Sequence, residues 1–153
     1  MPRKTRANVT QDELIALLHA EDYSAACLLG KKSIVHLRTI VEQRDSNLAA
    51  KATYLAGLLN ADESVGIIDA AAKSRKPALR AAAAAAAAHL SPNRAEPILL
   101  RLLKSKDIGI RKTAIKSAGS STTEKVRRQL ELLQTEEPDA HLKRLAADSL
   151  NPN

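Results

Sequence analysis

The chain has 153 residues, of which 44% are hydrophobic and 27% charged, with a formal net charge of +7. This balance is typical of one folded domain and excludes a disordered chain. Because there are two Tyr, no Phe or Trp and a single Cys, an aromatic core and an intramolecular disulfide are excluded, and aliphatic side chains with Ala have to fill the core.

A short pattern that begins with a cation recurs four times along the chain. The cations are 29, 31 and 32 positions apart, at Lys51, Arg80, Arg111 and Lys143. A period of this length marks one helix pair that is stacked repeatedly. We therefore predict an all-α fold, a gently curved, right-handed α-solenoid (α-α superhelix) of about five antiparallel helix pairs.

The first pair follows a polar start. Residues 1–9 are basic and polar without periodicity, which predicts a flexible basic tail. Thr10 and Glu13 have the spacing of a capping box, and the apolar residues behind them recur at helical intervals, so a helix is expected to begin there. A short second helix over residues 23–29 is expected to stop at Gly30, which suits the left-handed conformation beyond a helix end.

The middle of the chain continues with the same alternation of apolar stripes and turns. The second and third pairs are predicted at residues 34–41, 48–59, 62–74 and 77–90. Asn60 and Glu63 again have the spacing of a helix cap, which predicts that Asn60 opens the third pair. The eight alanines of residues 81–88 favour a helix that neighbouring helices can approach closely, so we expect this helix to be tightly sandwiched.

The last two pairs are predicted to begin at Ser91 and Ser121 and to end at Gly119 and Leu150. Glu124 follows Ser121 at the spacing of a further capping box. Pro97 falls inside or near the start of a helix, where it removes one backbone hydrogen bond and bends the axis. No segment alternates strictly between apolar and polar residues, so we expect essentially no strand.

The fourth pair contains the most regular copy of the repeated pattern. Its segment Asp107–Gly119 opens with an acid and continues with an Arg and small residues, and Pro97 lies in the helix before it. This pattern resembles the HEAT-like repeat that is also found in bacterial phycobilin-lyase-like proteins, with Ala118 where the repeat has Leu. The resemblance covers residues 11–150, implies a single HEAT-like repeat domain there, and implies an interaction scaffold. The repeat alone does not imply phycobilin-lyase activity.

The sequence shows no arrangement of residues typical of catalysis or metal binding. The four His are far apart, and there is no HExxH, CxxC or glycine-rich phosphate loop. A structural role is therefore expected for each His, and Cys27 is interpreted as a small core side chain. We predict no enzymatic activity, no cofactor and no metal.

The cellular location of the protein is predicted from its lack of long apolar segments. The basic residues at the start are not followed by the apolar stretch of a secretory signal. The longest apolar run, residues 81–88, is shorter than the roughly 20 residues that span a bilayer. We expect a cytoplasmic protein without membrane contact.

Positive charge is concentrated in one part of the chain. Residues 73–128 contain 14 Lys or Arg against three acids, whereas the remainder contains 10 against 14. This half should carry a strong positive field. Arg80 and Arg111 occupy a register that commonly braces adjacent units. The candidate partner-binding residues lie on the inner face of the second helices and at the turns: Lys112, Lys116 and Arg144, and Arg75, Lys76, Lys104 and Lys106.

These features predict a non-enzymatic protein-binding scaffold whose curved basic surface holds a protein or an acidic peptide. The alternative is a protein that binds the phosphate backbone of duplex nucleic acid with weak sequence selectivity. The shortage of aromatic residues disfavours single strands, which are bound largely by base stacking. A third interpretation, that the cations only keep an exposed face soluble, also stays open.

Overall fold

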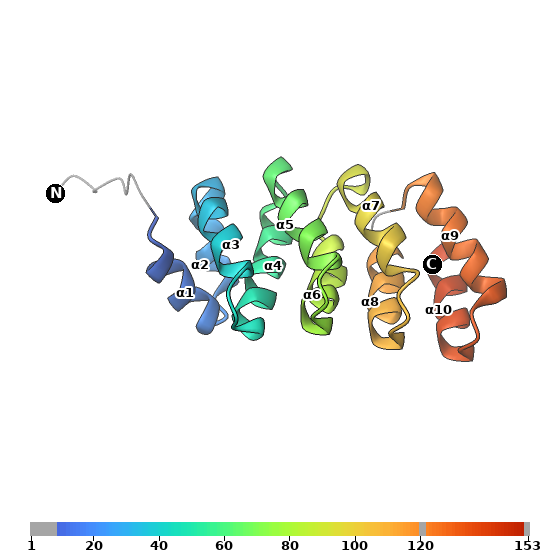
Figure 1. Cartoon of the computed structure of the whole chain (residues 1–153). Helices are drawn as coiled ribbons and strands as arrows, with labels where there is room; N and C mark the ends of the chain where they lie inside the picture. The colour runs from blue at the N-terminus through green and yellow to red at the C-terminus, as the bar shows by residue number, and fades with distance from the viewer. Residues whose placement is uncertain (1–8, 120–121, 152–153) are drawn as a thin grey trace.

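The computed structural model describes residues 9–119 and 122–151 and arranges them as a row of helix pairs (Figure 1). In these residues there are ten α-helices, one 3-10 helix, η1 (Gly30–Ser33), and no strand. The α-helices are α1 (Gln11–His19), α2 (Tyr23–Leu28), α3 (Ile34–Val41), α4 (Ser46–Leu59), α5 (Asp62–Ala72), α6 (Pro77–Ala87), α7 (Pro92–Leu102), α8 (Ile108–Gly119), α9 (Glu124–Glu136) and α10 (Ala140–Leu150). The predicted all-α solenoid of five pairs is confirmed.

Two layers of helices run along the stack. The first helices α3, α5, α7 and α9 contact one another in order, and so do the second helices α4, α6, α8 and α10. The contact between α4 and α6 is the most extensive of all. At the N-terminal end α1 and α2 both pack on α4, so that α2 extends the layer of second helices. This layer is the surface on which Lys112, Lys116 and Arg144 were predicted to lie.

Side-chain caps set where most of these helices begin. Thr10 Oγ1 accepts a hydrogen bond from the backbone N–H of Glu13 at 3.2 Å, which confirms the predicted start of α1. Four second helices begin in the same way, with a carboxylate that accepts from the N–H three residues on, at Asp22, Asp45, Asp107 and Asp139. Each cap satisfies an N–H that a helix start leaves unpaired. Gly30 has the expected positive φ of 67°.

Two predicted caps are wrong or untested. Asn60 does not open α5 but ends α4, in the left-handed conformation with φ 44° and ψ 43°. Its side chain accepts from the backbone N–H of Ser91 in the next pair, a tertiary contact that the local spacing does not encode. The residue before α5 is Ala61, whose N–H donates to Ser64 Oγ. Ser121 lies outside the described residues, and α9 is capped by Thr123.

Other details follow the sequence more closely. Pro97 lies inside α7, as predicted. Of the predicted tail, residues 1–8 lie outside the described part of the chain, and the carbonyl oxygen of Val9 accepts a hydrogen bond from His36 Nε2 at 2.7 Å. The 3-10 turn η1, which continues α2 towards α3, was not predicted.

The core is aliphatic, and the helices pack most closely where α6 lies between α4 and α8. Buried Leu, Ile and Ala from α1 to α10 form one continuous cluster. A Cβ placed on Gly57 of α4 would lie 2.6 Å from the carbonyl oxygen of Ala86, so α4 and α6 approach backbone to backbone. On the other side of α6, Ser117 Oγ of α8 donates to the carbonyl oxygen of Ala84 at 2.6 Å. The expected sandwiching of the alanine helix is confirmed.

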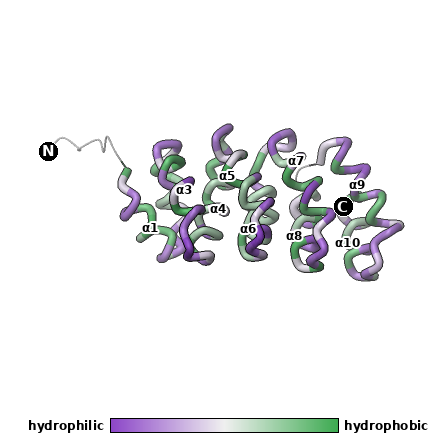
Figure 2. The backbone as a smooth tube through the Cα atoms, viewed as in Figure 1, coloured by the Kyte–Doolittle hydropathy of each residue, from purple (hydrophilic) through white to green (hydrophobic). Residues whose placement is uncertain are grey.

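The hydropathy of the chain agrees with this arrangement of the core. The most hydrophilic segments lie at the helix ends and turns along the two edges of the stack (Figure 2). None of the described helices combines the length and the apolar character needed to cross a membrane.

Candidate functional site

Three rings gather on the layer of second helices. Tyr23 of α2 and Tyr54 of α4 meet edge to face with centroids 5.1 Å apart, and Tyr54 meets His89, just after α6, in the same way at 5.3 Å. Tyr54 Oη and His89 Nε2 are joined by a hydrogen bond of 3.0 Å. Tyr23 and Tyr54 are partly exposed and His89 is exposed. We call these three residues the ring cluster.

The ring cluster contains both tyrosines of the chain. Burial raises the pKa of Tyr23 above its ordinary value, and the nearby Glu21 carboxylate and Tyr54 raise it further. The Tyr23 hydroxyl is therefore neutral at physiological pH. Edge-to-face pairs contribute about 0.5–1.5 kcal/mol beyond their buried area, so these contacts favour the observed arrangement of the rings. Sequence reasoning missed it, although the separation of the two tyrosines, 31 positions, is the repeat spacing itself.

The second feature of this layer is a row of cations at its other end. Lys112 and Lys116 lie four residues apart on α8, and Arg144 lies on α10, which packs against α8. Lys112 is partly exposed, whereas Lys116 and Arg144 are exposed. None of the three forms an ion pair with a described residue. We call them the cationic row; the structure places them in one layer, and their role in binding stays a prediction.

Helix α6 separates the ring cluster from the cationic row. Apart from Pro77 and Arg80 near its start, its outward positions are alanines, which project only a methyl group: Ala78, Ala81, Ala82, Ala85 and, directly after the helix, Ala88. Beside them lies a shallow hollow of about 380 Å³ lined by the starts of α6 and α8. Along the layer of second helices the outward groups are therefore, in spatial order, the ring cluster, the alanines of α6 and the cationic row. We call these outward alanines the alanine floor.

The four turn residues lie where they were expected. Arg75 and Lys76 are exposed in the turn between α5 and α6, and Lys104 and Lys106 are exposed in the turn between α7 and α8. Both turns join a first helix to a second helix, so they lie on the same edge of the stack (Figure 1). That they form a basic rim for binding is also a prediction.

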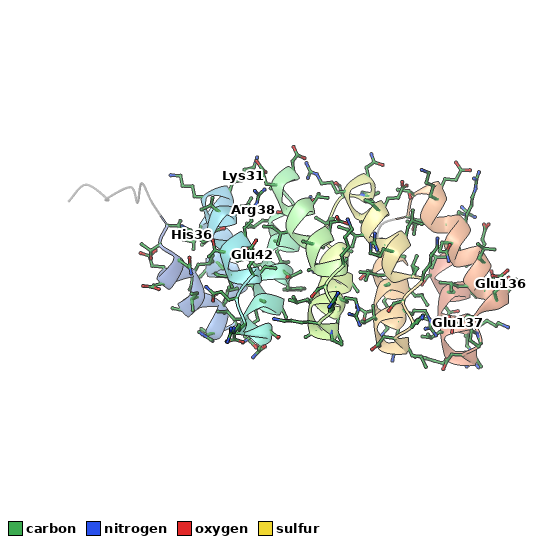
Figure 3. The ribbon with its side chains drawn as sticks, in the orientation of Figure 1. Lys31, His36, Arg38, Glu42, Glu136 and Glu137 are labelled. Atoms are coloured by element: carbon green, nitrogen blue, oxygen red, sulfur yellow. The ribbon has the colours of Figure 1, made fainter. Side chains whose placement is uncertain are left out.

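Arg111 braces two helix pairs, as its register suggested. Its Nε and Nη2 donate to the two carboxylate oxygens of Glu137 at 3.0 and 2.8 Å, and its Nη1 donates to the carbonyl oxygen of Ser105 at 2.8 Å. The side chain of Glu137 is only 2% exposed and that of Arg111 13%. Figure 3 shows Glu137 at the turn before α10. This pair ties the fourth unit to the fifth.

The expectation for Arg80 is not met. Its Nη1 donates to the carbonyl oxygen of Ser74 at 2.8 Å, inside its own unit. No hydrogen bond or ion pair joins Arg80 to a described residue of the next unit. This guanidinium therefore does not act as a brace.

The described residues contain no group of three or more His, Cys, Asp or Glu that could hold a metal ion. Cys27 is partly buried against the core, and burial raises the pKa of its thiol. The thiol stays protonated at neutral pH, which makes it a weak nucleophile.

Comparison with known proteins identifies a family and a similar fold. A family model described as HEAT repeats matches residues 64–151, more than half of the chain. The chain is also similar to a chain in the structure of the complex of CpcE and CpcF of phycocyanin lyase from Nostoc sp. PCC7120. The TM-score is 0.76, the sequence identity is 18%, and the match covers 91% of this chain and 96% of that one. No curated protein matches significantly.

The similar solved structure corrects the prediction that the chain is not an enzyme. That prediction rested on the absence of motifs typical of catalysis or metal binding, and the same fold occurs in a phycocyanin lyase complex. At 18% identity the likeness concerns the fold alone. Neither the family model nor this structure supports the nucleic-acid alternative.

Proposed function

Because the chain belongs to the HEAT-repeat family, we propose that it is a protein-binding subunit that holds its partner on the layer of second helices. The observation that carries this proposal is the gathering of both tyrosines in the partly exposed ring cluster, on the same layer as the cationic row. Tyr and Arg are enriched at the centres of protein interfaces, where they contribute most of the binding energy. The similar solved structure is itself a complex of two proteins.

The surface also indicates what kind of segment it holds. The alanine floor of α6 allows a partner backbone or helix to come close, because little more than methyl groups stands in its way. The ring cluster offers apolar contact area, and the cationic row offers charges that no described acid neutralises. The partner segment is therefore apolar at one end and acidic at the other, and opposite charges steer its approach.

Reversing two charges of the cationic row is expected to weaken partner binding at least about tenfold, because acids of the partner would then face carboxylates. The variant is Lys112→Glu with Lys116→Glu. Wild-type and variant proteins are immobilised, exposed to nuclease-treated lysate of the producing cells, and the captured proteins are quantified by mass spectrometry. Circular dichroism is expected to show the same helix content in both proteins.

The matched control reverses two cations on the layer of first helices, Lys125→Glu with Arg127→Glu on α9, which changes the net charge equally. It is expected to retain the captured protein. If both double variants lose the protein to the same extent, net charge and not this surface governs binding. If the wild type captures the protein from untreated lysate but not from nuclease-treated lysate, nucleic acid is the ligand and the proposal is wrong.

Truncating the central ring is expected to act independently of charge. Tyr54→Ala removes the ring that contacts both Tyr23 and His89, and the affinity for the captured partner should fall by about tenfold or more, as for an interface hot spot. Isothermal titration with the purified partner measures the change. The control is Asn47→Ala, which alters an exposed residue of the same helix α4 outside the ring cluster and should leave the affinity unchanged. Equal affinities of the two variants would show that the partner does not contact the rings.

A second candidate is favoured by one observation, the match to the phycocyanin lyase complex over nearly the whole length of both chains. The chain would then be one subunit of a two-subunit lyase and its protein partner the other subunit. Incubation with phycocyanin, with and without the captured partner, tests this. A change in the visible absorption of phycocyanin that requires both proteins supports the candidate, and an unchanged spectrum rejects it.

A further inference from the structure

We propose that the hollow between the third and fourth helix pairs binds a carboxylate side chain of the protein partner, through the guanidinium of Arg80. The inference rests on the proposed function in one respect, that the ligand is a protein. It concerns the edge of the stack and not the layer of second helices.

The turns before three second helices are built alike. A side-chain oxygen in each accepts from the backbone N–H two residues on, at Ser74, Ser105 and Glu137, with distances of 3.1, 3.2 and 3.2 Å. Six residues after each serine stands an arginine, Arg80 or Arg111, whose Nη1 donates to that serine's carbonyl oxygen at 2.8 Å. The two guanidinium groups are therefore anchored in the same way.

They differ in what lies in the next unit. Arg111 meets Glu137, whose carboxylate accepts from the other two nitrogens of the guanidinium, Nε and Nη2. The position equivalent to Glu137, one unit earlier, is Ser105, whose short side chain carries no charge. Nε and Nη2 of Arg80 consequently have no acceptor among the described residues, although the group is only partly exposed.

A hollow of about 360 Å³ takes the place of the missing carboxylate. Its lining includes four cations and one acid: Lys73, Arg80, Arg101, Lys106 and Asp107. Lys73 is paired with Asp69 at 2.8 Å, and the Asp107 carboxylate caps α8 through the N–H of Ile110. Arg80, Arg101 and Lys106 form no ion pair with a described acid, so their charges are not compensated and the hollow is electropositive.

A carboxylate fits this site for a reason visible in the same molecule. The pair of Arg111 and Glu137 shows that a guanidinium anchored in this way receives a planar carboxylate through two parallel hydrogen bonds. Such bidentate pairs are among the strongest hydrogen bonds in proteins. An aspartate or glutamate of the partner that enters the hollow completes between the third and fourth pairs the brace that Glu137 makes between the fourth and fifth.

The test uses a fluorescein-labelled hexaglutamate peptide, with binding followed by fluorescence anisotropy at low salt. Arg80→Gln is expected to weaken binding about tenfold, because the bidentate donor is lost. Ser105→Glu is expected to weaken it equally, because the new carboxylate pairs with Arg80 and fills the site. The same variant should unfold at a higher temperature than the wild type, which shows that the loss of binding is not a loss of fold.

Two variants with the same changes of charge at the surface of α9 serve as controls, Arg127→Gln and Gln134→Glu. Each is expected to change the affinity less than about twofold, because exposed charges there act only through the screened general field. If Arg80→Gln and Ser105→Glu bind the peptide as well as their controls do, the proposal is overturned. It is also overturned if a labelled DNA duplex binds more tightly than the peptide and depends on Arg80.

Failure of this inference is distinguishable from failure of the proposed function. The Lys112→Glu/Lys116→Glu variant leaves every residue of the hollow in place. Should that variant still capture the partner while Arg80→Gln does not, the partner binds at the edge of the stack, and the layer of second helices is not its docking surface. If Arg80→Gln binds the peptide as well as the wild type does, while the double variant no longer captures the partner, only the proposal for the hollow is rejected.

Discussion

Glu137→Gln is expected to lower the free energy of unfolding by about 3 kcal/mol, because it leaves the Arg111 guanidinium charged, mostly buried and without its counter-ion. The neutral amide has almost the shape of the carboxylate, so the change measures charge and hydrogen bonding, not volume. It also removes half of the bidentate geometry, since an amide NH₂ cannot accept. Urea unfolding followed by far-UV circular dichroism measures the loss as a lower midpoint.

The control is an ion pair of the same kind in solvent. Arg127 and Glu131 are 3.5 Å apart, with side chains 62% and 55% exposed, and Glu131→Gln is expected to cost less than about 0.5 kcal/mol. A double variant, Arg111→Met with Glu137→Leu, removes both buried charges and should regain most of the loss. Equal effects at residues 131 and 137 would mean that burial does not strengthen the pair.

The fold was predictable because its main determinant is a period that the sequence displays. The cations 29 to 32 positions apart indicated the size of the unit, and Thr10 and Gly30 marked a helix start and a helix end through short-range chemistry that the structure confirms. Asn60 and Glu63 also have the spacing of a helix start, but Asn60 ends a helix. Its conformation depends on Ser91 and Arg94, more than thirty positions away, which donate hydrogen bonds to it that local spacing cannot specify.

The candidate site was predictable only in part, for a related reason. The repeat register assigned Lys112, Lys116 and Arg144 to the second helices, and these helices do form one layer. Tyr23 and Tyr54 were treated as two rare residues, whereas the repeat brings them into contact. An arginine in this register braces two units only if the next turn supplies a carboxylate, as Glu137 does and Ser105 does not. Predicting the brace therefore requires an alignment of the turns with one another.

Absence of activity could not be inferred at all. Missing motifs exclude several familiar catalytic arrangements, but catalytic groups are individual side chains, and these can also lie on a surface or at a subunit boundary. The likeness to a phycocyanin lyase complex shows that this fold is compatible with such an assembly.

Gly57→Ala is expected to destabilise the chain by about 2 kcal/mol. The added Cβ would lie 2.6 Å from the Ala86 carbonyl oxygen and 2.8 Å from the Ala86 Cβ, so α4 and α6 have to move apart along the most extensive contact in the stack. Overpacking of this kind costs about 1–3 kcal/mol or more, and the obstacle here is backbone, which cannot rotate away. Alanine's better helix propensity offsets about 1 kcal/mol of that cost. Urea unfolding measures the net change.

Gly66→Ala is the matched control, since Gly66 also lies within a helix, α5, but has no atom within 4 Å of the position that a Cβ would take. There the helix propensity acts alone, and stability is expected to rise by about 0.5–1 kcal/mol. Opposite signs for the same substitution would show that close approach of α4 and α6, and not the flexibility of glycine, determines why residue 57 has no side chain. A stabilising Gly57→Ala would mean that the two helices can separate at little cost, and the surface of second helices would then be less rigid than the ring cluster requires.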